Sequence, residues 1–149
     1  MKLSTKGRYG LRAIVDLAVY SEEQPVSIRE IAKRQNISVR YLEQLLSKLK
    51  KAGMIKSVRG AQGGYLLAKP PEDVSVGDVL RALEGDLIAV DCAELMDGSE
   101  ECSGSRYCVT KTVWKKVNDN IQQTVDAILL SELIEESKTI HNKDEQTER

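Results

Sequence analysis

One stretch of the chain, residues 27–68, constrains the fold most, because it encodes two short helices, a tight turn and a hairpin. Ser27 and Glu30 have the spacing of a capping box, in which each side chain bonds the other residue's backbone N–H at a helix start. Residues 35–37 form a tight turn, and Ser38 is the N-cap of a second helix. The second helix turns one apolar stripe inward, made of Leu42, Leu45, Leu46 and Leu49. This succession predicts a helix-turn-helix.

A hairpin follows the second helix directly. Residues 55–59 alternate apolar and polar side chains like a strand, and residues 65–68 can pair back with them. Between them lies a flexible tip, Gly60-Ala61-Gln62-Gly63-Gly64. A two-stranded ribbon directly after a recognition helix is the wing of a winged helix. We therefore expect a mainly α fold, a winged helix-turn-helix with a small β-wing and a long C-terminal dimerisation helix.

The remaining segments extend this plan. Residues 7–20 carry an apolar helical stripe, and Ser75 is the N-cap of a further helix that closes at Gly85. Prolines 70 and 71 mark a boundary, since proline resists both helix and central strand. We expect residues 1–70 to form the DNA-binding region, residues 71–137 the cysteine loop and dimerisation helix, and residues 138–149 a polar, loosely ordered tail.

A long amphipathic helix is predicted from about residue 109. Its apolar residues recur every three or four positions over about five turns: Val113, Val117, Ile121, Val125 and Ile128. A stripe of this length exceeds what one small domain needs to cover itself, which favours a dimer helix. The alternative is a core helix packed within one chain.

Charge divides the chain into two halves. Residues 1–70 hold 14 Lys and Arg against 5 Asp and Glu, a formal +9, whereas residues 71–149 hold 8 against 18, a formal −10. A basic half beside an acidic half is typical of a protein that meets a polyanion, although an unevenly charged solvated surface is the alternative. The N-terminus lacks the apolar run of a signal peptide, and no segment has the roughly 18 apolar residues needed to span a bilayer. We therefore expect a cytoplasmic protein without membrane partners. With one histidine, His141, and no phosphate loop or nucleophile constellation, we do not expect an enzyme.

A recognition helix reads the major groove through its first turns, where side chains reach base edges. The residues at those positions are Ser38, Val39, Arg40, Tyr41, Glu43 and Gln44. Arg40 and Gln44 are four apart and share a face, with side chains suited to guanine and adenine edges. Glu43 either accepts a hydrogen bond from a cytosine amine or repels other sequences; the alternative is a salt bridge to Arg40 or Lys50.

The hairpin supplies a second set of candidate contacts. Arg59 at the base of its tip suits the narrow minor groove or a phosphate, the alternative being an ordinary solvated arginine. Gly60, Gly63 and Gly64 let the backbone approach the duplex closely. Phosphate contacts are expected from Lys2, Lys6, Arg8, Lys48, Lys50 and Lys51.

The three cysteines, Cys92, Cys102 and Cys108, lie in one acidic segment rich in Ser and Gly. An odd count without a signal peptide does not describe a disulfide framework. Thiolates are soft ligands suited to zinc, copper or iron–sulfur clusters, and the paired spacing that zinc favours is absent. The alternative is three unrelated thiols.

Three segments resemble the IscR-type family of winged-helix repressors, and the match covers nearly all of residues 1–137. The segments are LSTKGRYG at 3–10, SVRYLEQL at 38–45 and VRGAQGGYLL at 58–67. The resemblance implies a homodimer whose long C-terminal helices cross, with iron–sulfur or thiol sensing. It also implies control of genes for cluster assembly, cysteine supply or stress response. A two-fold dimer would bind pseudo-palindromic double-stranded DNA.

The resemblance maps the family's three cluster ligands onto Cys92, Cys102 and Cys108, with a 2Fe–2S cluster favoured and 4Fe–4S as the alternative. The chain departs from the family in the longer first cysteine gap and in Lys111, which replaces a histidine three residues after the last cysteine. Because Arg8 stands where some family members offer a carboxylate ligand, and His141 is distant in sequence, the fourth ligand is left open. The candidates are Asp91, Glu94, Glu100, Glu101 or a group of the other protomer. The competing hypothesis retains DNA binding without a cluster, with sensing by thiol oxidation or by a metabolic-enzyme partner.

Overall fold

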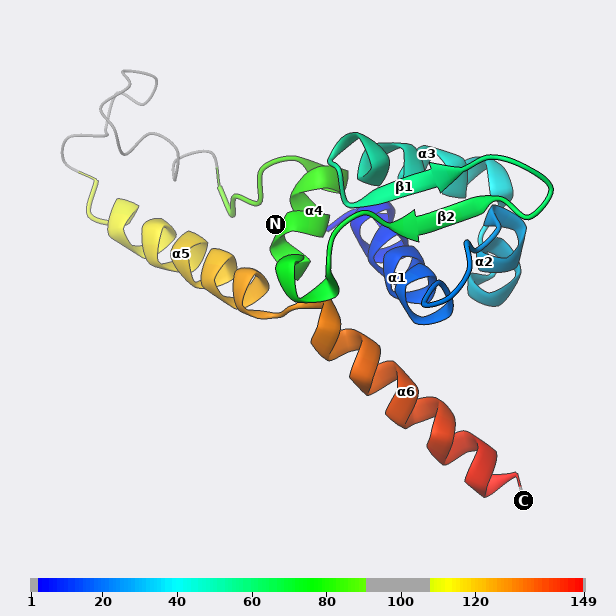
Figure 1. The fold of residues 1–149 in the computed structure, drawn as a ribbon. Helices are drawn as coiled ribbons and strands as arrows, with labels where there is room; N and C mark the ends of the chain where they lie inside the picture. The colour runs from blue at the N-terminus through cyan, green and yellow to red at the C-terminus, as the bar shows by residue number, and fades with distance from the viewer. Residues whose placement is uncertain (1–2, 91–107, 149) are drawn as a thin grey trace.

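The computed structural model describes residues 3–90 and 108–148, and helices dominate this part of the chain (Figure 1). In chain order the elements are α1 (Thr5–Tyr20), α2 (Ile28–Gln35), α3 (Val39–Lys51), β1 (Ile55–Val58), β2 (Gly64–Leu67), the 3₁₀ turn η1 (Pro71–Asp73), α4 (Val76–Glu84), α5 (Lys111–Ala127) and α6 (Leu130–Thr147). The predicted helix-turn-helix is α2 and α3, and the predicted wing is β1 and β2.

Local capping forms the helix-turn-helix as the sequence predicts. The Glu30 carboxylate accepts from the Ser27 backbone N–H at 3.0 Å, and the Glu30 N–H donates to the Ser27 hydroxyl at 3.3 Å. Asn36 ends α2 in the left-handed conformation with φ 53°, which asparagine tolerates better than most residues. Ser38 begins α3 by accepting from the Tyr41 N–H at 3.2 Å. The turn therefore sets α3 across α2 within three residues.

The wing is an antiparallel pair in which Ile55 lies opposite Leu67 and Val58 lies opposite Gly64. Strand β1 is one residue shorter than predicted, since Arg59 lies outside it, and β2 has the predicted length but begins one residue earlier, at Gly64, so that Ala68 lies outside it. Val26 and Tyr65 exchange backbone hydrogen bonds of 3.0 and 2.8 Å, which joins the wing to the segment before α2. The wing is thereby fixed at its base to the helix-turn-helix.

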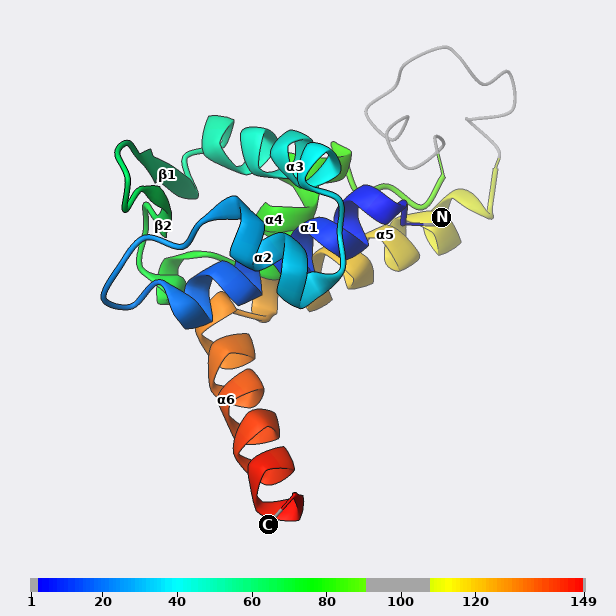
Figure 2. The same ribbon diagram turned by 90° about the vertical axis from the view of Figure 1, so that its right-hand side faces the viewer.

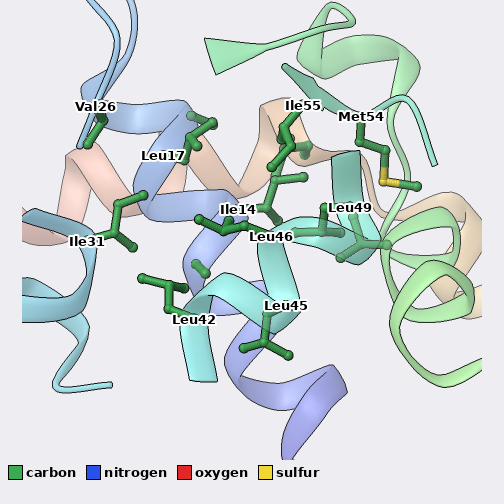
Figure 3. Packing of buried hydrophobic residues seen from close by; sticks show 14 of the residues in the cluster. Ile14, Leu17, Val26, Ile31, Leu42, Leu45, Leu46, Leu49, Met54 and Ile55 are labelled. Carbon is green, nitrogen blue, oxygen red and sulfur yellow. The ribbon is translucent and has the colours of Figure 1, made fainter. Parts of the chain in front are cut away.

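The core lies between α1 and α3, where the four leucines of the α3 stripe are 0–1% exposed. Figure 3 shows these leucines gathered near Ile14 and Leu17 of α1 and Ile55 of the wing. Burying one such aliphatic side chain stabilises a fold by about 1.5–3 kcal/mol. The apolar periodicity of α1 and α3 is therefore explained within a single chain.

The structure shows a polar cluster between α1 and α2 that the sequence did not predict. Asp16 is buried, with 2% of its side chain exposed, and Arg34 holds both of its carboxylate oxygens at 2.7–3.2 Å. Gln35 donates to the same carboxylate at 2.8 Å, and the guanidinium lies 3.9 Å from the centre of the Tyr20 ring. The hydrogen bonds to Asp16 raise the pKa of Arg34 above its ordinary value. This cluster fixes the end of α2 against α1.

Helix α6 extends away from the compact part of the molecule in both views, and α5 extends away from it in the opposite direction in Figure 1 (Figures 1 and 2). The predicted helix from residue 109 is observed as α5, but Ile128 is not helical and the chain turns there. The expectation of a loosely ordered segment from residue 138 was wrong, because α6 continues to Thr147. Leu130 and Ile134 bury the start of α6 against the core, and Glu and Lys residues are interspersed among weaker helix formers after them. No helix in the described residues is long and apolar enough to cross a membrane.

Candidate DNA-binding surface and cysteine segment

The first turns of α3 present a continuous polar surface. Ser38, Arg40, Glu43 and Gln44 are exposed, and Val39 is 37% exposed. Leu42 and Leu45 of the same turns are buried, so the helix is anchored by one face and free on the other. The unpaired N–H groups at a helix start carry partial positive charge, which favours an approaching phosphate. The structure therefore brings five of the six predicted contacts on α3 together on one accessible face, and Tyr41 is the exception.

Tyr41 differs from its neighbours because it is half-buried against α1. Its hydroxyl donates to the Thr5 hydroxyl at 3.1 Å, and its ring meets the Tyr9 ring edge-on at 6.2 Å between centroids. The Arg12 guanidinium lies 5.2 Å from the centre of the Tyr9 ring. In the free protein Tyr41 holds the start of α3 against α1, a packing role that the sequence did not indicate.

Glu43 makes no ion pair within the described residues, so the alternative of a salt bridge to Arg40 or Lys50 was wrong. Lys50 instead donates to the Ser57 hydroxyl of the wing at 2.8 Å. An exposed carboxylate in the middle of a recognition surface penalises any sequence that offers it no hydrogen-bond donor.

The wing glycines divide into two kinds. Gly60 has φ 118° at an open, exposed tip, a conformation that L side chains rarely adopt. A Cβ atom on Gly63 would overlap the Val58 carbonyl, and one on Gly64 would overlap the Val26 carbonyl. Packing within the chain thus already accounts for Gly63 and Gly64, although their predicted role was approach to DNA. Arg59 beside Gly60 is exposed.

Two of the three cysteines, Cys92 and Cys102, lie outside the described residues, as do Asp91, Glu94, Glu100 and Glu101. Cys108 is exposed just before α5, with its sulfur 3.1 Å from the Thr110 hydroxyl. Hydrogen bonds from the Thr110 side chain and the Lys111 backbone lower the pKa of Cys108 below its ordinary value. A thiol with a lowered pKa has more thiolate, the form that binds metals and reacts with oxidants.

Within residues 3–90 and 108–148 no three His, Cys, Asp or Glu side chains are grouped to hold a metal ion. His141 lines a groove of about 610 Å³ between α6 and helices α1 and α2. Cys108 precedes α5, which begins at the opposite end of the molecule from the C-terminal part of α6 (Figures 1 and 2). His141 and Cys108 of one chain therefore do not share a site.

A helix-turn-helix with an exposed recognition helix, a glycine-tipped wing and a basic N-terminal half defines a winged-helix DNA-binding regulator. The model of the Rrf2 family, described as an iron-dependent transcriptional regulator, matches residues 3–136. The chain belongs to this family, and its relatives are transcription regulators rather than enzymes.

Individual relatives span almost the whole chain. The HTH-type transcriptional regulator IscR of Aliivibrio salmonicida is 41% identical over 146 residues, which are 98% of this chain and 84% of that protein. Among solved structures, T. potens IscR is 45% identical with a TM-score of 0.73, over 92% of this chain and 88% of that one. CymR, the global cysteine regulator of B. subtilis, is 37% identical with a TM-score of 0.75, over 91% of this chain and 97% of that one. These structures confirm the mainly helical winged-helix fold.

Proposed function

We propose that this protein is a homodimeric cytoplasmic repressor that binds pseudo-palindromic operators and senses iron–sulfur cluster status through Cys92, Cys102 and Cys108. Its targets would be genes of cluster assembly, cysteine supply or stress response. The observation that carries DNA binding is the exposed first two turns of α3 beside the wing. T. potens IscR and the cysteine regulator CymR match the fold with nearly equal TM-scores, 0.73 and 0.75, so the fold does not separate cluster sensing from thiol sensing and the cysteines of this chain carry the proposal.

The proposed DNA contacts lie on α3 and the wing. Arg40 and Gln44 read base edges in the major groove, with Glu43 discriminating against unsuitable sequences. Arg59 enters the minor groove or contacts a phosphate, and Gly60 brings the backbone of the tip close to the duplex. The remaining members of the surface, Ser38, Val39, Tyr41, Gly63 and Gly64, shape and position it.

Dimerisation is assigned to α5. This helix, described over its whole length, has no buried residue in the single chain. Its exposed apolar side chains, Val113, Trp114 and Val117, are 49%, 37% and 37% exposed and follow one another along its first two turns. A second copy of the helix would cover this stripe, because a contiguous exposed apolar patch is typical of a protein interface.

The cluster proposal rests on Cys108, which fits the role of a ligand. Its thiol is accessible, and the Thr110 hydroxyl and Lys111 N–H favour the thiolate. Cys92 and Cys102 would complete the cysteine ligands, with the fourth ligand from a nearby carboxylate or the partner protomer. A bound cluster would supply a centre sensitive to oxidants and to iron supply. We favour a 2Fe–2S cluster over a 4Fe–4S cluster. Because Cys108 lies three residues before Lys111, the first residue of α5, holding the thiolate in place would also hold the start of the dimer helix.

Thiol sensing is the second candidate, and the same cysteine favours it. An exposed thiol with a lowered pKa is readily oxidised. Oxidation of Cys108, or binding of a metabolic enzyme to the acidic C-terminal half, would then replace the cluster as the signal.

Anaerobic purification separates these candidates. We expect a coloured protein with iron and sulfide near the cluster's stoichiometry, and a colourless Cys108→Ser variant. Lys143→Ala, an exposed change in α6, should keep the colour. A wild-type protein that stays colourless and iron-free after reconstitution, but whose operator affinity changes on oxidation, would instead establish thiol sensing.

DNA binding has its own test with operators selected from random duplexes. Arg40→Ala should weaken binding about 10- to 100-fold and relax base preference, since one bidentate base contact contributes about 1–3 kcal/mol. Lys143→Ala removes the same charge far along α6 and should change affinity less than about twofold. Equal effects of the two variants would refute the assignment of α3 as the reading helix.

A further inference from the structure

Helix α4 lies between the DNA-binding elements and α5 and approaches the helices on both sides closely. On one side, a Cβ atom on Gly10 of α1 would overlap Leu83, and one on Gly7 would come within 2.8 Å of the Glu84 carboxylate. On the other side, a Cβ atom on Gly77 of α4 would overlap the Asp126 carboxylate of α5. Glycine at each position lets the helices pack without an intervening side chain.

A polar cluster joins α4 to α5 over Gly77. The Arg81 guanidinium donates to the two oxygens of Asp126 at 2.8 and 2.9 Å and also to the Gln122 side-chain oxygen. The Gln122 amide in turn donates to the Leu87 carbonyl, just beyond α4. We name these three side chains, Arg81, Gln122 and Asp126, the Arg81 cluster. A bidentate guanidinium–carboxylate pair fixes direction as well as distance.

Backbone hydrogen bonds hold the end of α5 against the start of α4. The Val76 N–H donates to the Ile128 carbonyl at 2.8 Å, and the Leu130 N–H donates to the Val74 carbonyl at 2.8 Å. Val125 and Ile128 of α5 also pack against Val76 and Leu80 of α4 at this end. The Arg81 cluster adds directional hydrogen bonds to Gln122 and Asp126, which resist a change in the angle between the two helices. Val113 and Trp114, in the first turns of α5, are 49% and 37% exposed in the single chain.

The other end of α4 contacts the helices of the DNA-binding region. The Lys48 ammonium of α3 donates to the Leu83 carbonyl at 3.3 Å. The Glu84 carboxylate accepts from the backbone N–H groups of Ser4 and Gly7 at 3.0 and 2.8 Å, which caps the start of α1. The orientation of α5 relative to α4 therefore fixes its orientation relative to the recognition helix.

We propose that the Arg81 cluster sets the spacing between operator half-sites that the dimer accepts. This inference rests on the proposed function, because it requires a two-fold dimer built on α5. In such a dimer the two recognition helices are related through α5, so the angle between α4 and α5 determines how far apart and at what rotation they present themselves. One added base pair turns a half-site by about 35° and moves it by about 3.4 Å. Arg81 is thus a positioning residue, remote from the bases, that determines specificity.

The test compares binding of wild-type protein and Arg81→Met to operators whose half-sites are separated by the selected spacing or by one or two base pairs more or less. Methionine keeps an aliphatic side chain and removes the guanidinium. We expect the affinity of the wild type to fall at least about tenfold for each base pair added to or removed from the selected spacing, because one or more base contacts are lost. For Arg81→Met the affinity should fall less than about threefold for each such base pair. Its affinity for an isolated half-site should equal that of the wild type.

Two further variants make the result specific. Asp126→Asn keeps the shape of the cluster but removes its charge and should flatten the spacing preference partly. Lys143→Met removes a charge from α6 away from the cluster and should keep the wild-type preference. Sedimentation and a cooperative thermal transition establish that each variant is a folded dimer. Should Arg81→Met fail this check, Gln122→Leu takes its place.

The outcomes distinguish failure of the proposed function from failure of this inference. A wild-type protein that selects no duplex, or that binds as a monomer, contradicts the proposed function and this inference with it. Sharp, unchanged spacing preference in both Arg81→Met and Asp126→Asn overturns the inference and leaves the proposed function standing.

Discussion

Helices α3 and α5 carry the same kind of apolar stripe, but the single chain covers the whole stripe of α3 and only the last part of the stripe of α5, where Val125 and Ile128 pack against α4. The four leucines of α3 are 0–1% exposed in the single chain, whereas Val113, Trp114 and Val117 of α5 are 37–49% exposed. Periodicity therefore identifies a helix and its apolar face, but it does not say which molecule covers that face. For α3 the cover is α1 and the wing, and for α5 we propose a second copy of the chain.

The largest effect is expected when a side chain is removed from the buried stripe of α3. Leu46→Ala should lower the free energy of unfolding by about 3 kcal/mol, since it deletes buried methyl groups and leaves a cavity. Urea denaturation measures this loss. Val117→Ala is the matched change in α5, and in a monomer it should cost less than about 1 kcal/mol because the side chain is 37% exposed. A loss for Val117→Ala that grows with protein concentration would show that a second copy covers it.

A charge placed in the exposed stripe of α5 tests directly whether a second copy of the chain covers it. Val117→Asp should weaken dimerisation about 100-fold, because an unpaired carboxylate would be buried between two apolar helices. Trp114, the only tryptophan in the chain, lies in the same stripe and reports the change. Its fluorescence should shift to longer wavelength on dilution of the wild type, and the variant should already show the shifted spectrum. Sedimentation at the single-chain mass of 16.6 kDa for both proteins at all concentrations would contradict the assignment.

The same contrast explains how much of the molecule the sequence predicted. Capping at Ser27, Ser38 and Ser75 depends on residues three positions away, so local reasoning found all three helix starts. The buried Asp16 was missed because Arg34, its partner, is 18 residues distant and nothing local marks the pairing. The turn at Ile128 was missed for the same reason, since its backbone bonds go to residues 74 and 76.

In the candidate site, too, local sequence predicted some features, and contacts between distant residues determine the others. The exposed face of α3 follows from helical geometry once its buried face is known, so Arg40, Glu43 and Gln44 were found together. The packing role of Tyr41 and the steric roles of Gly63 and Gly64 depend on α1 and Val26, which only the fold brings near. Cys92 and Cys102 lie outside the described residues, and their role stays a prediction.

Two arginine–aspartate pairs compare how firmly α2 and α5 are attached to the fold, with smaller expected losses in the free energy of unfolding. Arg34→Met should lower the free energy of unfolding by about 2 kcal/mol, because it leaves the buried Asp16 carboxylate with Gln35 alone. Arg81→Met should cost less than about 0.5 kcal/mol, because the Asp126 side chain is 47% exposed and water replaces the lost partner. Thermal denaturation at one protein concentration compares them. Equal losses would mean that α5 is as firmly integrated into the fold as α2.

The smallest expected effect concerns Glu84, where α4 meets the start of α1. Burial alone would raise the pKa of Glu84, but hydrogen bonds from the Ser4 side chain and from the Gly7 and Ser4 backbone outweigh it and lower the pKa below its ordinary 4.5. A carboxyl whose pKa is lower in the folded state stabilises the fold above pH 4.5 and loses that contribution as the pH falls through the folded-state pKa. Glu84→Gln keeps an acceptor for the N–H groups without the charge, so it should be less stable than wild type by under about 1 kcal/mol at pH 7 and equally stable near pH 3. Urea denaturation across this range measures the difference, with Glu145→Gln in the exposed part of α6 as the control. A difference between wild type and Glu84→Gln that persists undiminished at pH 3 would mean that the shape of the side chain, rather than its charge, joins α4 to α1.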